Sequence, residues 1–585
     1  MERPLSRRDF LDGIAMTAGL AAFGVPDGGA IKSPGQQITA FAPHLTGLRG
    51  DSSPALSVPH ALRDGRFWQH AGTPVPTGEV YDLVVVGGGA SGVSAAREWL
   101  SAYPGASVLI LDNRDELGGR ERAGGPLTGG YDSVMCDRET FATERLIRRS
   151  RAVAQWVDRL PMAERARRDL LRLYRDPPDW FAGLAPRAKR ERLAGMTYSG
   201  FLLEVCRAHP DVERFCRTMS SSEWARGASA LTALDAMSGA RGWAYPGFGG
   251  LGLERSGSPR VGPEHSGSLS VRAVVAGLIP GAGCQGGLDR PGSRIRLRLS
   301  SPVVSVRNDG PPESATGATV GYFDGHRVRT VRAGSVILAC WQLVIPYLMP
   351  DLPADQRAAL REAVRLPLVE AVVRLRDQRA WRRTGVTATR WTGAYWCLTE
   401  LTGPSGAGRN TRNHGDDHGR DRERGHDGGG RGSGDRDGGG WDGGNEDGGN
   451  EDGGFWDGDR DGPVEVRLVA APCRSELGAA AGAAAGRRAL MRTPYSTLEY
   501  GIRDQLTRLL GSGGFDPARD IEAITVYRWG HGHPAGHLEH GSHLPSSAEV
   551  ARRRFGRVAI AGSDSAAVFP ASVVAARRAV RELSA

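Results

Sequence analysis

The pattern of apolar and polar positions divides the chain into strand-rich and helix-rich stretches. The apolar, β-branched run at residues 83–86 is typical of a parallel strand buried on both faces. Further strands are predicted at residues 107–111, 294–299, 303–306, 319–323, 327–331, 336–339, 368–375, 464–471, 524–528 and 558–561. Apolar residues at helical spacing predict helices at residues 59–68, 141–160, 163–174, 198–209, 354–364, 497–510 and 571–583.

A glycine-rich turn follows the first buried strand and precedes a predicted helix. Its glycines, Gly87, Gly89 and Gly92, have the G-x-G-x-x-G spacing. In such a turn the first glycine permits a tight bend, the second lets the backbone approach a pyrophosphate, and the third lets helix and strand pack closely. Ser91 lies at the helix N-terminus, where backbone N–H groups bind phosphate oxygens. The turn predicts dinucleotide binding.

An acidic residue ends the next predicted strand. Asp112 stands 20 residues after Gly92, where a carboxylate accepts hydrogen bonds from a ribose. Strand, turn, helix, second strand and acid therefore occur in the order that a dinucleotide-binding unit requires.

Two further segments indicate which dinucleotide binds. A polar residue, a glycine pair and an arginine follow Asp112; they are Asn113, Gly118, Gly119 and Arg120. This segment resembles the second fingerprint of the FAD-containing amine oxidase superfamily. Near the C-terminus a predicted strand leads into Gly562 and Asp564, and it resembles the late motif of those flavoproteins, in which the acid binds the ribityl chain. A nicotinamide enzyme needs no such returning motif, so the predicted cofactor is FAD.

More motifs are spread over most of the chain from about residue 40. They lie at residues 45–50, 60–65, 109–113, 136–141, 245–253, 288–293, 336–347, 514–521 and 528–532. As a set they resemble the spermidine dehydrogenase-like group of that superfamily. Residues 403–462 have no part in this resemblance.

The resemblance implies an α/β fold, with a Rossmann-like FAD-binding domain assembled from discontinuous segments and a mixed α+β substrate domain. It places Val304 and Ala339 among the residues that bind FAD. The expected organisation is a signal at residues 1–30, an arm at 31–80, FAD-binding parts at 81–125, 285–345 and 531–585, a helical substrate region at 126–284 and a substrate domain at 346–530.

The same resemblance implies an enzyme that oxidises a C–N bond of an amine. The expected substrate is a polyamine such as spermidine, and the flavin accepts the hydride. Two alternatives stay open: a flavin-binding protein with a degenerate substrate site, favoured by the short segment at residues 123–135, and a flavin desaturase or other oxidoreductase on the same fold.

Trp529 and His531 are the candidate catalytic residues, since the resemblance places them on the substrate side of the flavin. With an ordinary pKa of about 6.5, His531 could deprotonate the substrate ammonium. Trp529 could form an aromatic wall for a cation, or it could simply pack in the core. A lysine–water pair at the flavin is not expected, because the two lysines, Lys32 and Lys189, lie outside the flavin motifs.

His531 begins a histidine-rich stretch that ends at His543. Such clusters can bind zinc or copper, but we expect a solvated loop with one active-site histidine and no metal. None of the seven cysteines forms a C-x-x-C pair, so dithiol chemistry, a zinc ribbon and covalent c-type haem have no sequence signal.

The first residues predict a targeting segment. Arg7 and Arg8 precede a weakly apolar run at residues 13–25, as in a twin-arginine export signal. We therefore expect recognition by the twin-arginine export machinery and a periplasmic or extracellular location. No apolar run reaches the roughly 18 residues of a membrane span, so no stable span is expected.

Composition changes the picture in two respects. The formal charge is +9, but the arginines are spread thinly, so we expect a solvated surface and no nucleic-acid partner. The expected partners are a small amine and an electron acceptor that the sequence leaves open. Residues 403–462 hold 22 of the 83 glycines and are predicted to be a disordered insert.

Overall fold

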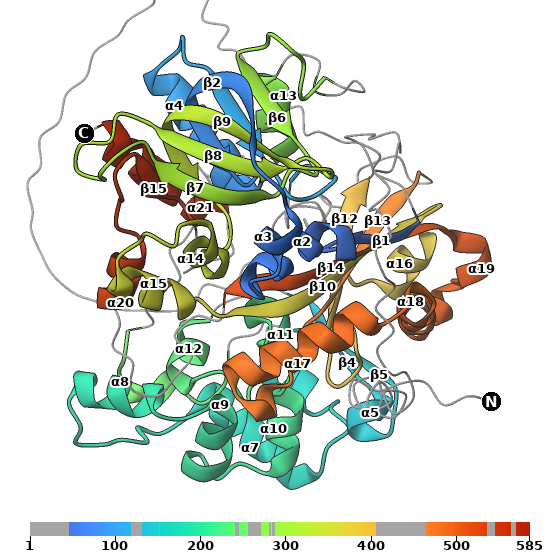
Figure 1. The fold of residues 1–585 in the computed structure, drawn as a ribbon. Helices are drawn as coiled ribbons and strands as arrows, with labels where there is room; N and C mark the ends of the chain where they lie inside the picture. The colour runs from blue at the N-terminus through green and yellow to red at the C-terminus, as the bar shows by residue number, and fades with distance from the viewer. Residues whose placement is uncertain are drawn as a thin grey trace, which may run out of the picture.

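Two β-sheets organise the part of the chain that the computed structural model describes. This part comprises residues 46–118, 131–150, 152–239, 245–254, 271–279, 282, 287–404, 462–534, 545–562 and 569–584. Figure 1 shows one sheet at the top with α4 and α21, the second sheet in the middle, and the helices α7 to α12 at the bottom. The twin-arginine segment and most of the glycine-rich insert lie outside the described residues.

The first sheet has a parallel centre built from distant parts of the chain. Its parallel strands lie in the order β6 (Ile295–Arg298), β3 (Val108–Leu111), β2 (Val75–Val86), β9 (Val328–Leu338) and β15 (Val558–Ile560). The first half of β9 also pairs in antiparallel fashion with β8 (Ala318–Phe323), which pairs with β7 (Val303–Asn308). The predicted α/β fold with a discontinuous Rossmann-like unit is confirmed.

Both faces of this sheet are covered, which explains the unbroken apolar runs of β2 and β3. One face packs against α4 (Ala90–Ala102), α13 (Val271–Leu278) and α21 (Phe569–Ser584). The other face packs against the β7–β8 ribbon and the helices α2 (Ser53–Arg63), α3 (Phe67–His70), α14 (Ile345–Leu348), α15 (Ala354–Arg361) and α20 (Pro545–Ala551).

Chain order reverses between β2 and β9. From β2 the chain builds outward through β3 to β6, and it later returns to the opposite side as β9. In parallel sheets a ligand binds at such a switch point, beyond the carboxyl ends of the strands.

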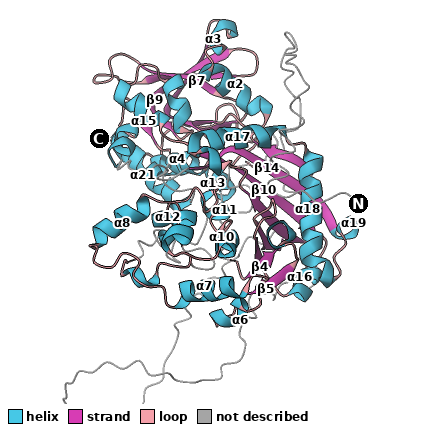
Figure 2. Ribbon diagram, turned by 90° about the horizontal axis from the view of Figure 1, so that it is seen from below, coloured by secondary structure: helices cyan, strands magenta, loops and turns pink. Residues whose placement is uncertain are grey.

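The second sheet has eight strands and carries the substrate-side candidates. Its order is β1 (Gly47–Gly50), β14 (Ile521–Pro534), β10 (Arg365–Leu375), β13 (Val464–Ala470), β12 (Leu398–Pro404), β11 (Ala388–Trp391), β4 (Ser133–Cys136) and β5 (Arg145–Arg148). In Figure 2, α7, α8, α10 and α12 lie on one side of β10 and β14, and α18 lies on the other.

Helices flank this sheet on both sides. On the side of the larger core lie α6 (Val153–Val157), α7 (Glu164–Arg175), α8 (Pro186–Ala194), α9 (Tyr198–Gly200) with a π-helical turn at Phe201–Val205, α10 (Pro210–Cys216), α11 (Ser221–Trp224) and α12 (Ala233–Ser238). The remaining helices include α16 (Arg379–Thr384), α17 (Ala479–Arg492), α18 (Tyr495–Leu510) and α19 (Pro517–Asp520). No helix among the described residues is long and apolar enough to cross a bilayer.

One predicted helix is wrong, and it lies in the stretch expected to be helical. Residues 141–160 form the strand β5 and the short helix α6 instead of one long helix. The preceding helix, α5 (Arg138–Phe141), ends at Ala142, whose φ of 54° is left-handed. The chain then runs along β4, and Ile147 enters the core while its flanking arginines face outward. Tertiary pairing therefore outweighs the helical spacing.

An ion-pair network closes the outer edge of the first sheet. Glu79 accepts bonds from Arg296 (2.6 Å) and Arg298 (2.7 Å), and Asp289 binds the same two guanidinium groups (2.5 and 2.8 Å). The Arg298 hydrogen bond lowers the pKa of Glu79 most, and burial opposes it. The network joins β2 to β6 and to the loop that precedes β6.

We expect Glu79→Gln to lower the free energy of unfolding by about 1–3 kcal/mol, because both arginines lose a charged acceptor. The folded-state pKa of Glu79 lies below its unfolded value, so its stabilisation is complete above the unfolded pKa and is lost as pH falls through the folded pKa. The Tm difference between wild type and variant should therefore shrink between pH 6 and pH 3.

Glu522→Gln is the matched control, since Glu522 forms an exposed pair with Arg374 (2.8 Å). Its expected effect is below about 1 kcal/mol. Equal Tm changes in the two variants would contradict a structural role for the Glu79 network.

Candidate functional site

The glycine-rich turn has a geometry in which each glycine meets a different constraint. Gly87 has a φ of +112°, and a Cβ there would lie 2.8 Å from the carbonyl oxygen of Ala339. A Cβ on Gly92 would lie 1.8 Å from the carbonyl oxygen of Gly87. Gly89 differs, because a Cβ there would meet nothing within 4 Å. The turn thus packs closely at its two ends and leaves open space at its middle glycine.

That open space lies at the N-terminus of α4. Gly89 is the N-cap residue and provides no side-chain cap, so within the described ranges the N–H groups of the first turn receive no acceptor from the N-cap position. Ser91 is buried within this turn. Uncapped N–H groups and the helix dipole together favour a phosphate oxygen here.

Asp112 is buried at the end of β3, beside the turn. Its Oδ2 accepts from the Gly88 N–H (2.6 Å) and its Oδ1 from the Arg114 N–H (2.8 Å). A carboxylate has about four acceptor sites, so two remain for ribose hydroxyl groups. Open space at Gly89, free N–H groups and a fixed acid fit the adenosine diphosphate half of FAD.

Some of the other predicted cofactor residues lie at the carboxyl ends of the strands, and others do not. Ala339 and Gly562 follow β9 and β15 at the same strand ends, and Gly118 has a left-handed φ of 105°. Asn113 instead donates its amide to the Ala55 carbonyl of α2 (2.9 Å), and the Val304 side chain is fully buried in the core on the β7 side. In this structure these two side chains contact the protein itself. Gly119, Arg120 and Asp564 lie outside the described residues.

Trp529, on β14, is more enclosed than a substrate wall would be. Its side chain is buried, its Nε1–H donates to Glu370 (3.1 Å), and its ring stacks on Tyr527 with centroids 6.0 Å apart. The Arg114 guanidinium already lies over this ring, 5.4 Å from its centroid. The cation on Trp529 is therefore supplied by the protein itself.

His531 has an environment that the sequence did not indicate. Its ring packs against Trp341 with centroids 4.6 Å apart, and its Nδ1 is buried with no hydrogen-bond partner among the described residues. Burial, then the charges of Arg487 and Arg365, lower the pKa of His531 to about 3. The ordinary pKa assumed from the sequence does not hold, so the imidazole is neutral and a weak base at neutral pH.

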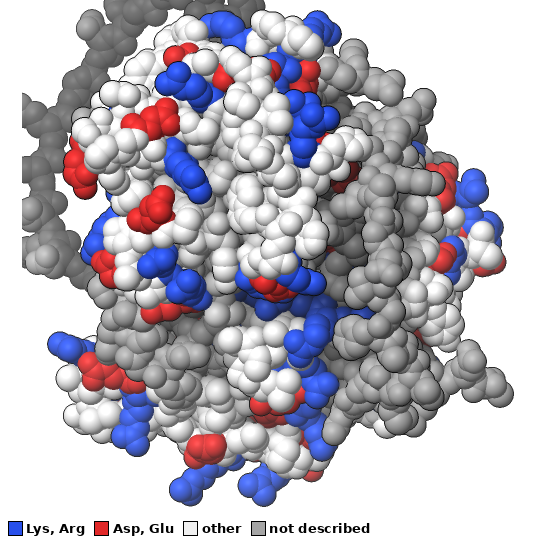
Figure 3. Space-filling view, viewed as in Figure 1, with Lys and Arg blue, Asp and Glu red and all other residues white. Residues whose placement is uncertain are grey.

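Sequence reasoning missed most of the side chains around His531. We call the set His60, Arg114, Arg365, Arg487 and His531 the Gly530 basic cluster, because its other members lie close enough to His531, the residue after Gly530, to lower its pKa. Asp51 binds Arg114 (2.8 Å) and accepts from the Gly530 N–H (2.8 Å). His60 was within a recognised motif, but Arg487 had no local signal. Figure 3 draws one face of the molecule in the view of Figure 1. Basic side chains form a band across the middle of this face, at the level of α2 and β10.

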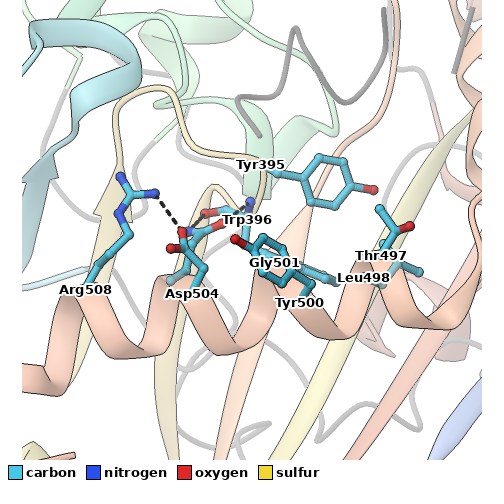
Figure 4. Close-up of a pocket in the computed structure, with 9 residues that line it drawn as sticks. Tyr395, Trp396, Thr497, Leu498, Tyr500, Gly501, Asp504 and Arg508 are labelled. Atoms are coloured by element: carbon cyan, nitrogen blue, oxygen red, sulfur yellow. Dashed lines mark hydrogen bonds and ion pairs between the residues drawn. The ribbon is translucent and has the colours of Figure 1, made fainter. Parts of the chain in front are cut away.

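A separate pocket lies on α18, and Figure 4 shows its lining. Several of its polar groups are paired: Trp396 and Gln505 exchange two hydrogen bonds (2.9 and 3.1 Å), and Asp504 pairs with Arg508 (3.3 Å). The bonds between Trp396 and Gln505 hold α18 against the segment that precedes β12. Within the described ranges no group of three or more His, Cys, Asp or Glu side chains could hold a metal ion.

A family model that matches part of the chain agrees with the predicted cofactor. Residues 82–274 match the family model described as FAD dependent oxidoreductase, DAO. Wild-type putrescine oxidase bound to putrescine is similar at 15% identity over 86% of this chain and 99% of that chain, with a TM-score of 0.46. Cyclohexylamine oxidase from Brevibacterium oxydans IH-35A shares 16% identity over 86% and 98%, with a TM-score of 0.48. The matched segment contains the glycine turn and Asp112, and the cofactor is FAD.

The turn predicts opposite outcomes for two glycine substitutions. Gly89→Val should leave the fold intact, because its φ of −79° suits any residue and its Cβ meets no atom, yet the side chain would fill the space of the diphosphate. Gly92→Val should unfold the region, because its Cβ would collide with Gly87. Flavin absorbance and Tm of the purified variants distinguish the two. A Gly89→Val protein that retains a full complement of FAD would refute the site.

The pKa of His531 gives a second prediction. Because that pKa is lowered to about 3, the imidazole should stay neutral from pH 5 to pH 9. In protein with 13C-labelled histidine, the Cε1–H signal that His531→Gln removes should not shift over this range. His70, which is exposed, provides a reference signal assigned in the same way. A midpoint near pH 6.5 for His531 would contradict its enclosure by the cluster.

Proposed function

We propose that this protein is an FAD-dependent oxidoreductase that oxidises the C–N bond of an amine. The observation that carries the proposal is the FAD site at the strand ends of the first sheet, joined through Arg114 and Asp51 to Gly530 and His531 of the second sheet. The family resemblance of the sequence, with its set of motifs from residue 45 to residue 532, supports an amine as the substrate.

Different residues of the chain would bind different parts of the cofactor and the substrate. The N-terminus of α4 would hold the diphosphate, and Asp112 would hold the adenosine ribose. When bound, the flavin supplies the acceptor for the hydride. The substrate side is lined by β14, whose glycines at positions 530 and 532 pack closely against neighbouring side chains.

Deprotonation of the amine does not need His531 as a base. Only the neutral amine has the lone pair that forms the C=N bond as hydride leaves. Nearby positive charges lower the pKa of an ammonium group, because they disfavour its charged form. Two like charges 4 Å apart repel by about 4 kcal/mol at an effective dielectric constant of about 20. The Gly530 basic cluster thus favours the neutral amine by its field.

The polyamine suggested by the resemblance is a narrower proposal. Its support is the set of motifs, and the basic cluster opposes it, since a polyamine keeps further positive charges after one nitrogen loses its proton.

Export by the twin-arginine route is likewise proposed from Arg7 and Arg8 alone. Trypsin accessibility of the protein in intact spheroplasts, compared between wild type and an Arg7→Lys, Arg8→Lys variant, tests it.

Anaerobic titration of the FAD-loaded protein tests the function. We expect an amine to bleach the flavin absorbance band, at a rate that rises with pH as the neutral amine becomes more abundant. Spermidine, primary monoamines and α-amino acids are compared at equal concentration, with FAD-loaded protein and no added amine as the control. If no amine bleaches the band in protein that holds FAD, amine oxidation is wrong and a degenerate site or another reaction replaces it.

A further inference from the structure

Four arginines are buried among the described residues, and one of them has no carboxylate partner there. The other three have such a partner: Arg226 with Asp235 (3.2 Å), Arg296 with Glu79 (2.6 Å) and Arg467 with Glu370. The fourth, Arg390 of β11, is 2% exposed, and no described carboxylate lies within ion-pair distance of its guanidinium group. Because a buried charge is normally paired, the environment of Arg390 needs an explanation.

The nitrogens of Arg390 differ in their hydrogen bonds. Its Nη1 donates to the Phe215 carbonyl (2.8 Å) and to the Thr218 hydroxyl (2.9 Å). Its Nε and Nη2 are buried and have no hydrogen-bond partner in the described part of the chain. These two nitrogens form one edge of the planar guanidinium group, and such an edge can donate two parallel hydrogen bonds to a carboxylate. The unsatisfied part of Arg390 therefore has the geometry that a carboxylate requires.

Two buried phenol groups lie within the field of Arg390. The hydroxyl groups of Tyr174, on α7, and Tyr245, which follows α12, have no hydrogen-bond partner within the described ranges. Burial raises the pKa of both phenols well above the ordinary value, and the charge of Arg390 acts on each in the opposite direction. Both hydroxyl groups are therefore protonated at neutral pH, and each can donate a hydrogen bond.

The other neighbours of Arg390 do not replace a counter-ion. Its guanidinium lies over the rings of Phe215 and Tyr131, at 4.7 and 5.5 Å from their centroids. Such ring contacts stabilise a cation by less than burial destabilises it. Water could satisfy the unpaired donors but would leave the charge uncompensated, whereas an anion would do both.

We propose that Arg390, Tyr174 and Tyr245 bind the carboxylate group of a small molecule in the core between the second sheet and the helices that cover it. The Nε–Nη2 edge of Arg390 would donate to both carboxylate oxygens, and the two phenol groups would donate to the lone pairs that remain. This site does not depend on amine oxidation, since it is defined by groups that need a ligand whether or not the flavin reacts.

The position of Arg390 in the sheet limits which molecule can carry this carboxylate. Paired residues connect β11 to β14 through three intervening strands, in the order Arg390, Leu398, Val469, Glu370 and Tyr527. With about 4.8 Å for each step between neighbouring strands, Arg390 lies roughly 19 Å from β14. The nitrogen and the carboxyl group of an α-amino acid share one carbon atom, so such a molecule could not reach both places.

Two kinds of molecule carry a suitable carboxylate. One is a small acid that binds independently of the reaction. The other is a long amino acid whose acid end lies at Arg390 while its nitrogen reaches β14. The second source rests on the proposed function and the first does not, so the experiments separate them.

Thermal unfolding of the FAD-loaded full chain tests the site without turnover. Acetate or benzoate replaces chloride at constant sodium concentration and pH, and acetamide and benzamide are the neutral isosteres. A ligand that binds only the native protein raises the Tm as its concentration rises. We expect the carboxylates to raise the Tm of wild type and the amides to leave it unchanged.

Variants of the site and a matched control locate the binding. Arg390→Met should abolish the Tm rise, and Arg390→Lys, which keeps the charge but loses the planar edge, should weaken the apparent affinity about 10- to 100-fold. Tyr174→Phe and Tyr245→Phe should each weaken it about 3- to 10-fold. The control is Tyr198→Phe, because the Tyr198 hydroxyl in the same core donates to the Pro246 carbonyl (3.0 Å). This control should lower the Tm but keep the full carboxylate-dependent rise.

Three outcomes would overturn the proposal. The first is an equal Tm of wild type in carboxylate and in chloride at every concentration. The second is a carboxylate-dependent rise that persists in Arg390→Lys and Arg390→Met. The third is a rise that neither tyrosine substitution weakens. If Arg390→Met does not fold, Arg390→Lys and the tyrosine variants decide the result.

Anaerobic flavin reduction then separates the two sources of the carboxylate. Long ω-amino acids are compared with alkylamines of equal chain length, in wild type and Arg390→Lys. A lower Kd for the amino acid, removed by Arg390→Lys and by competing acetate, would assign the carboxylate to the substrate. Equal Kd values together with the Tm rise would assign it to an independent acid. If no amine reduces the flavin, the proposed function is wrong, and the thermal experiment still decides the carboxylate site.

Discussion

One buried carboxylate, Asp51, links the edge of the cofactor sheet to the substrate-side sheet. It directly follows β1, and its backbone N–H donates to the Arg528 carbonyl of β14 (2.7 Å). Its two oxygens accept from Gly530 on β14 and from Arg114, which lies two residues beyond Asp112. Since Asp112 also binds the Arg114 N–H, the ribose acid and the substrate strand are joined through Arg114 and Asp51. Removing Asp51 would leave a buried guanidinium uncompensated, which is among the most costly changes in a protein interior.

This linkage decides the electrostatics of the site. Arg114 uses the charge of Asp51 and lies between the rings of Trp341 and Trp529, at 5.2 and 5.4 Å from their centroids. Burial alone would lower the pKa of Arg114, but Asp51 and Asp112 outweigh it and raise that pKa. Arg487, another member of the cluster, has no carboxylate within ion-pair distance among the described residues and donates to the Arg365 carbonyl. Burial first, and then the charges of Arg487 and Arg365, lower the pKa of His531 and keep it neutral. The same charges would disfavour an ammonium group brought beside them.

The sequence predicted those features that depend on local conformation. The apolar run of β2 and the left-handed φ of Gly87 follow from neighbouring residues, so the dinucleotide unit was recognisable. The strand β5 was not, because it exists through pairing with β4. The position of Arg487 was hidden for a similar reason: α17 approaches residues 472–474 through Gly482 and Gly486, where a Cβ would lie 2.2 and 2.1 Å from backbone oxygens. With arginines spread along the whole chain, composition could not show which of them gather at one place.

The fold and the charge distribution act on different properties of the reaction. The glycine turn and Asp112 fix where FAD lies, and many chemistries use such a site. Which substrate reaches it depends on the groups on β14, β10 and α17. An amine nitrogen brought to that place would meet the field of the basic cluster, which would favour its neutral form and disfavour a further ammonium group on the same molecule.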